Sequence, residues 1–190
     1  MKMKCLFLYG CLFLCLGACQ TPPEFSKTPA ITLDRLAKFH LNKIYDEEGI
    51  PISQGRDSIN ISLNFKDGDG DLGLDQSDLV PPYYVNGKKT DYYNNFFIDM
   101  YVLKHKKWSK IIFDHNLNFN SQFQRFQKGD KKSPLKGTMY YNFSIDNSVP
   151  ETFNFGYKDT LMFEVYILDR ALNKSNTVTT DPVILSLEKP

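Results

Sequence analysis

INISLNF, residues 59–65, is the stretch that most clearly indicates how this chain folds. Apolar residues occupy every second position, and asparagine or serine fills the positions between them. Successive side chains of a strand point to opposite faces, so the pattern predicts a β-strand with one face in a core and the other in water. The apolar members are Ile59, Ile61, Leu63 and Phe65.

Further β-rich runs follow along the chain and are separated by turn residues. Phenylalanine and tyrosine, which favour strands, occur 15 and 11 times. This recurrence predicts an all-β fold, a single antiparallel immunoglobulin-like β-sandwich, rather than alternating strands and helices. The runs lie at residues 95–113 (two strands around a turn near Lys106 and Lys107), 137–145, 161–168 and 177–185.

Two segments allow a second interpretation. Residues 31–44 fit strand alternation, apart from Arg35, and fit a helix equally well. We predict a first strand there, because an edge strand suits the rest of the sheet. Residues 117–132 are open between a long loop and a short helix through Phe119, Phe123 and Phe126.

The first residues predict export. Lys2 and Lys4 precede the nearly wholly apolar residues 5–16, a run shorter than the roughly 20 residues that a membrane-spanning helix needs. The sequence LGAC at residues 16–19 resembles the bacterial lipobox, which implies cleavage before Cys19 and a diacylglycerol on its sulfur. An ordinary secretory signal with an incidental cysteine is the alternative.

This interpretation divides the chain into a signal peptide (1–18), a lipidated cysteine with a proline-rich tether (19–30) and a β-sandwich domain (31–190). Gln20 stands where an aspartate would mark inner-membrane retention, so we predict an outer-membrane lipoprotein, facing the periplasm or the cell surface. Its membrane contact is the lipid anchor. Loss of Lys2 and Lys4 changes the formal net charge from +1 to −1, which gives no electrostatic case for a nucleic-acid partner.

Cysteine chemistry is excluded from the mature chain. Three of the four cysteines leave with the signal peptide, and only Cys19 stays. A single cysteine forms no internal disulfide, and a lipidated one supplies neither a thiol nucleophile nor a zinc ligand.

The aspartate-rich stretch FKDGDGDLGLDQSD, residues 65–78, indicates a cation site. Its spacing matches positions 1, 3, 5, 7, 9 and 12 of the EF-hand calcium loop, although Leu72 replaces the turn glycine and a strand precedes the loop. We therefore predict a structural calcium ion in a β context, with an acidic turn as the alternative. The predicted ligands are Asp67, Asp69, Asp71, Gly73, Asp75 and Asp78.

A second loop, DRALNKSN at residues 169–176, lies between the last two predicted strands. In an immunoglobulin-like sandwich this loop and the aspartate loop cluster at the same end. Asp169, Asn173 and Asn176 are therefore further candidate ligands, and a plain hairpin loop is the alternative.

DGDGDLGL after an alternating strand, with the late LDRALNKSNTV, is similar to a group of uncharacterised Bacteroidota envelope lipoproteins with an immunoglobulin-like or fibronectin-type domain. The resemblance covers the chain from about Ile31 onward. It implies a sandwich in the cell envelope and no enzymatic activity.

Catalytic motifs are weak. His40, His105 and His115 are scattered, and the chain has no HExxH or GxSxG motif and no phosphate-binding glycine loop. We therefore predict a non-enzymatic, lipid-anchored binding or structural module, whose protein or glycan partner stays open. The alternative is an envelope hydrolase that uses the acidic loop as a catalytic metal site.

Overall fold

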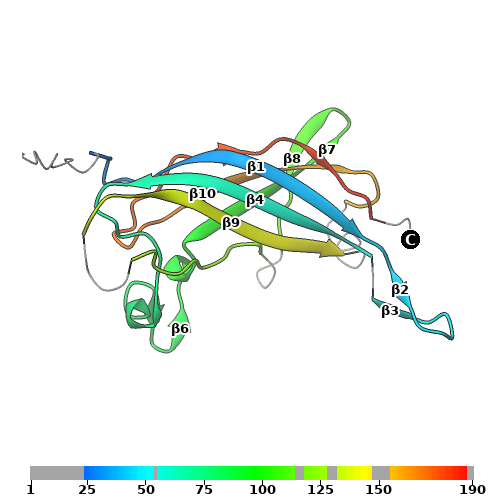
Figure 1. Ribbon diagram of the computed structural model, residues 1–190, viewed down its shortest axis with the longest axis horizontal. Helices are drawn as coiled ribbons and strands as arrows, with labels where there is room; N and C mark the ends of the chain where they lie inside the picture. The colour runs from blue at the N-terminus through cyan, green and yellow to red at the C-terminus, as the bar shows by residue number, and fades with distance from the viewer. Residues whose placement is uncertain (1–23, 54, 114–117, 128–131, 147–154, 188–190) are drawn as a thin grey trace, which may run out of the picture.

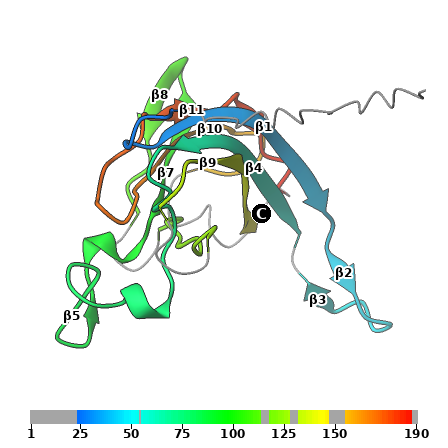
Figure 2. The ribbon, with the colours of Figure 1, turned by 60° about the vertical axis from the view of Figure 1, so that its left-hand side comes forward.

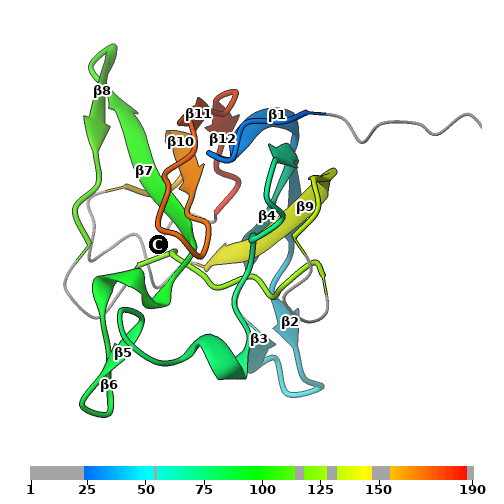
Figure 3. The same ribbon diagram turned by 90° about the vertical axis from the view of Figure 1, so that its left-hand side faces the viewer.

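The computed structural model describes residues 24–53, 55–113, 118–127, 132–146 and 155–187. The predicted signal peptide, Cys19 and the first part of the tether lie outside these ranges. Within them, two antiparallel sheets pack face to face (Figures 1 and 3). The only helices of this described part are two single 3-10 turns, η1 (Gln76–Asp78) and η2 (Asp91–Tyr93).

The smaller sheet contains β1 (Ala30–Leu41), β4 (Arg56–Asp67) and β9 (Leu135–Asp146), in the order β1-β4-β9. The larger sheet contains β7 (Phe96–Lys104), β8 (Lys107–Lys110), β10 (Thr160–Ile167) and β11 (Val178–Thr179), in the order β11-β10-β7-β8. A short strand, β12 (Val183–Ile184), also pairs with β10. This is the strand order A-B-E and G-F-C-C′ of an immunoglobulin-like sandwich, and the predicted fold is confirmed.

The core lies between the two sheets, where the alternating residues of β4 meet those of β10. Ile59, Ile61 and Leu63 of β4 are fully buried, as are the four apolar residues at every second position of β10. The ring of Phe143 in β9 meets the ring of Phe163 in β10 edge-on, with centroids 5.4 Å apart. Alternate residues of β4 and β10 are buried against each other, and this packing holds the two sheets together.

Residues 30–41 form strand β1, as predicted, and a β-bulge explains their helix-like spacing. The bulge lies between Leu33 and Arg35, so that Leu33 pairs with Leu63 while Leu36 pairs with Ile61. The extra residue keeps both leucines on the core side although they are three positions apart. Such a spacing in a sequence is ambiguous between a helix and a bulged strand.

The described part of residues 117–132 is a loop packed on the core, not a helix. Ser121 forms a two-way backbone bridge with Phe96 at the start of β7. The Asn95 side chain donates to the Phe123 carbonyl and accepts from the Phe123 amide, at 2.9 and 2.8 Å. Phe119 and Phe123 pack against the core from this loop.

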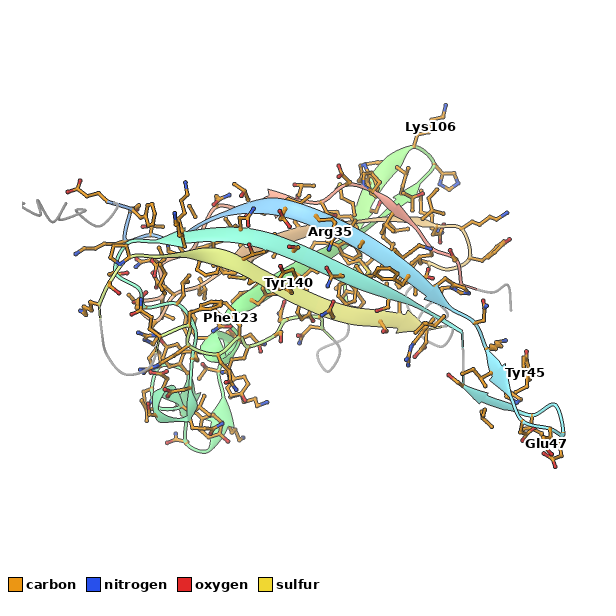
Figure 4. All side chains as sticks on the ribbon, viewed as in Figure 1. Arg35, Tyr45, Glu47, Lys106, Phe123 and Tyr140 are labelled. Carbon is orange, nitrogen blue, oxygen red and sulfur yellow. The ribbon has the colours of Figure 1, made fainter. Side chains whose placement is uncertain are left out.

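A hairpin of β2 (Ile44–Tyr45) and β3 (Pro51–Ser53) projects from one end of the sandwich (Figure 2). Tyr45 and Glu47 lie out on it (Figure 4), and its apolar residues are more than half exposed. A smaller hairpin is made by β5 (Tyr84–Val85) and β6 (Lys88–Lys89). Within the described ranges, no helix has the length and apolar character needed to cross a membrane.

Candidate metal centre

The aspartate loop begins where β4 ends, and it meets the loop that follows β10. Leu72 and Asp169 form an antiparallel backbone bridge. The Arg170 amide donates to the Asp71 carbonyl at 3.2 Å, and the Arg170 guanidinium donates to the Gly73 carbonyl at 3.1 Å. The two loops lie at one end of the sandwich, as the immunoglobulin-like strand order predicts.

Three aspartates of the first loop face one another. Carboxylate oxygens of Asp67, Asp69 and Asp71 all lie within 4.8 Å of one another. The Oδ1 atom of each is buried and has no hydrogen-bond partner, and the Asp67 residue is 0% exposed. Burying carboxylate oxygens without partners is costly, because the water that solvated them is not replaced. The cluster therefore has the chemistry of a site that binds a cation.

Burial, and then the crowding of like charges, raises the pKa values of these carboxyl groups. Burial, with the neighbouring charges of Asp71, Asp69 and Asp169, raises the pKa of Asp67 to about 7. Burial and the charges of Asp169 and Asp69 raise the pKa of Asp71 to about 6, although Arg170 opposes the shift. Burial also raises the pKa of Asp169. Each carboxylate thus costs free energy to ionise beside the others, unless a positive charge sits among them.

The glycine between Asp69 and Asp71 is required by the path of the loop. Gly70 has a φ of +73°, which side chains disfavour, and a β-carbon there would lie 2.1 Å from the Ser133 carbonyl oxygen. The Asp71 amide then turns back and donates to Oδ2 of Asp67 at 3.0 Å. Alternate residues of an extended strand share a face but lie about 7 Å apart, and this tight turn brings the aspartates closer together than a strand would.

The donor set suits calcium. Asp67, Asp69 and Asp71 offer hard oxygen ligands, which calcium prefers, and Asp169 adds a fourth carboxylate close by. Calcium also accepts backbone carbonyls and water, which complete a shell of 6–8 oxygens in other proteins. A bound calcium ion would be the missing partner of these three carboxylate oxygens.

The carboxylates of Asp75 and Asp78, two further predicted ligands, have other partners and are not part of the cluster of Asp67, Asp69 and Asp71. The Asp75 carboxylate caps η1 by accepting from the Ser77 amide at 2.8 Å, and Asp78 accepts from the Asp75 amide at 2.8 Å. Arg125 pairs with both carboxylates. The hydrogen bonds from the Ser77 side chain and backbone, with Arg125, lower the pKa of Asp75.

Three other predicted ligands are also used elsewhere. The Gly73 carbonyl accepts from Arg170. The Asn173 amide group donates to Asp169 Oδ2 at 2.9 Å, so it supports Asp169 rather than joining the cluster itself. The Asn176 side chain is bound to the backbone of Ile31 through both its oxygen and its nitrogen. Of the second loop, only Asp169 lies beside the aspartate cluster.

Arg125 and Arg170 are residues that sequence reasoning missed. Both hold the aspartate loop, Arg125 through Asp75 and Asp78 and Arg170 through the carbonyls of Leu72 and Gly73. The role of Arg170 could have been suspected from the sequence, because Arg170 directly follows the candidate ligand Asp169. Arg125 lies in a distant glutamine-rich segment, and no local pattern links it to the loop.

A hollow of about 400 Å³ lies beside the second half of the loop. It is lined by Leu74, Asp75, Gln76, Ser77, Gln122 and Gln124, and by none of the three clustered aspartates. The aspartate cluster and this hollow are therefore separate features of the same end of the molecule. No protein-family model, curated protein or solved structure matches the chain, so its function has to be inferred from the site itself.

Proposed function

We propose that this protein is a lipid-anchored, non-enzymatic binding or structural module of the cell envelope, whose immunoglobulin-like sandwich is stabilised by a calcium ion. The observation that carries the calcium assignment is the set of three buried carboxylate oxygens without partners, on Asp67, Asp69 and Asp71. An acidic turn exposed to solvent would hydrate these oxygens instead of burying them together.

The geometry favours a structural ion over a catalytic one. A catalytic metal keeps an open position beside a substrate cleft, whereas a structural ion is enclosed. Asp67 is fully buried, and the hollow beside the loop is lined by other residues. Among the described histidines, His40 pairs with Asp57 and His105 lies in the β7–β8 turn. Neither of these histidines is placed to act as a base at the cluster.

The envelope location rests on the sequence that precedes the sandwich. A basic start, an apolar run and LGAC occur together and end at Cys19. Two or more acyl chains on one residue anchor a protein stably, whereas a single chain binds reversibly. The short tether after Cys19 then places the sandwich close to the outer membrane, on its periplasmic or its surface face.

Calcium binding is tested by thermal unfolding of the mature protein. We expect 10 mM calcium to raise Tm by roughly 5–10 °C, since an ion that binds at about 10⁻⁴ M stabilises only the folded state. Magnesium should do less, because it requires a smaller octahedral shell and loses water reluctantly. A chelator should reverse the shift.

The double variant Asp69→Asn/Asp71→Asn should abolish this response, because it keeps the loop shape and removes two charged ligands. Asp75→Asn is the matched control, since Asp75 lies in the same stretch but pairs with Arg125. It should keep the calcium shift. Equal melting temperatures of the wild type with calcium and with chelator would refute the calcium site.

Lipidation is tested by labelling cells with palmitate. Cys19→Ser should lose the label and accumulate as unprocessed precursor or soluble protein, because the sulfur that carries the lipid is gone. Cys15→Ser is the control, since it removes a cysteine of the same apolar segment and should still be labelled. Full labelling of Cys19→Ser would show that the protein is not anchored there.

A further inference from the structure

The segment that leads into the sandwich is docked on the aspartate loop. The Gly68 amide donates to the Ser26 carbonyl at 2.8 Å. A β-carbon on Gly68 would lie 2.2 Å from the Phe25 carbonyl oxygen and 2.7 Å from that of Ser26. The Lys66 ammonium lies 5.7 Å from the centre of the Phe25 ring. The base of the tether thus lies against the backbone between two of the clustered aspartates.

The second loop holds the same segment a few residues further on. Asn176 accepts from the Ile31 amide and donates to the Ile31 carbonyl, both at 2.8 Å. Asn176 closes the loop that begins at Asp169, the carboxylate beside the cluster. Residues 25–31 are therefore held by both loops that form the candidate metal centre.

This end of the sandwich is also the end at which the chain enters from the side of Cys19. The chain reaches β1 from the end where β4 finishes (Figure 1). Only six residue steps separate Cys19 from Phe25, and an extended chain covers at most about 20 Å in that length. With Cys19 lipidated, Phe25 and the loop it touches must lie within about 20 Å of the bilayer surface.

We propose that the aspartate loop is a cation-dependent joint, in which calcium at Asp67, Asp69 and Asp71 fixes residues 25–31 on the sandwich and so sets the orientation of the domain on the membrane. This inference rests on the proposed calcium site and lipid anchor. Gly68 lies between two of the ligands and donates to Ser26, so a loop that opened without the ion would move the Gly68 amide away from the Ser26 carbonyl.

Repulsion between the clustered carboxylates is the physical reason why the loop would release the tether in the absence of calcium. Without a cation, three carboxylates lie within 4.8 Å of one another with buried oxygens that have no partner, and opening the loop relieves this cost. Opening moves Gly68 and removes the hydrogen bond to Ser26. The freed tether then allows the sandwich to reorient about its lipid anchor. When the tether is docked on the loop, the sandwich has a fixed orientation relative to the tether.

The test uses the full-length lipidated protein in phosphatidylcholine vesicles, cleaved with endoproteinase Lys-C. Lys27 is exposed but lies within the docked segment, and a protease needs a locally undocked chain to cut there. We expect calcium, compared with chelator, to slow cleavage after Lys27 by at least about tenfold. Cleavage after Lys106, in the turn at the far end of β7 (Figure 4), should be unchanged and controls for the protease.

Gly68→Ala separates the joint from the ion site. The added methyl group meets the Phe25 and Ser26 carbonyls, so the tether should be cut equally fast with and without calcium. The three aspartates are retained, so calcium should still raise Tm. Gly87→Ala adds a methyl group in open space in the β5–β6 turn, at a φ of +73° that strains that turn locally, and it should keep the calcium protection of Lys27.

Two results would overturn the joint while leaving the calcium site intact. One is a wild type whose Tm rises with calcium but whose Lys27 cleavage does not slow. The other is Gly68→Ala with the same calcium protection of Lys27 as the wild type. A wild type with no calcium response in either measurement would overturn the proposed function, and the joint with it.

Discussion

Lowering the pH from 8 to 5 is expected to weaken calcium binding by roughly a hundredfold through Asp67 alone. A carboxylate ligand must be ionised to bind the ion, and burial raises the pKa of Asp67 to about 7. At pH 5 the site must therefore lose a proton before calcium enters. Asp71, whose pKa is raised to about 6, should add to the decrease.

Isothermal titration calorimetry of the mature protein at several pH values measures this dependence. Repeating the titration at pH 7 in buffers of different ionisation enthalpy should reveal protons released by calcium, because a proton leaves the site as the ion binds. A calcium affinity that is constant between pH 5 and pH 8, with no proton release, would contradict the assignment of Asp67 as a ligand.

Asp67→Asn is expected to have opposite effects with and without calcium. Without calcium at pH 8, it should stabilise the protein by about 2–4 kcal/mol, because it removes a charge whose pKa is raised from 3.8 to about 7. With saturating calcium the variant should be less stable than the wild type, because it has lost an ionised ligand. Urea unfolding in both conditions measures the two free energies.

The stability gained by Asp67→Asn in the absence of calcium should depend on pH. The folded protein binds the Asp67 proton more tightly than the unfolded chain, so the ion-free wild type should lose stability as the pH rises from about 4 to about 7. At pH 4 the gain from Asp67→Asn should therefore vanish. Asp75→Asn, at a carboxylate whose pKa is lowered, should give no such gain at pH 8. A destabilised ion-free Asp67→Asn at pH 8 would mean that Asp67 is not under electrostatic strain.

Much of the fold was readable from the sequence because its strands are amphipathic. Ile59, Ile61 and Leu63 alternate with polar residues, a pattern that by itself indicates a strand with one buried and one exposed face. The β1 segment was harder, since the bulge between Leu33 and Arg35 places two leucines three positions apart on one face. A bulge depends on the partner strand, and a single segment of sequence does not contain that information.

The candidate metal centre was predictable only in part. Asp67, Asp69 and Asp71 are consecutive members of one motif around a glycine that permits a tight turn, so their convergence is local. Asp75 and Asp78 have the right spacing too, but η1 and the distant Arg125 take their carboxylates. The spacing of aspartates in the sequence does not show which of their oxygen atoms have other hydrogen-bond or ion-pair partners in the fold. Oxygen atoms without such partners are the ones that remain available to a metal ion.

The amino-acid sequence alone indicates an all-β sandwich through its period-two pattern and places an acidic loop after its central strand, and from it we expect an export signal that is cleaved before Cys19. Contacts between residues far apart in the chain were visible only in the folded structure. It brought Asp169 beside the aspartate loop, assigned Asn176 to Ile31, and laid Phe25 and Ser26 on Gly68. The reason is physical, because alternation and turn propensity act within a few residues, whereas these contacts arise only when the two sheets bury their common core.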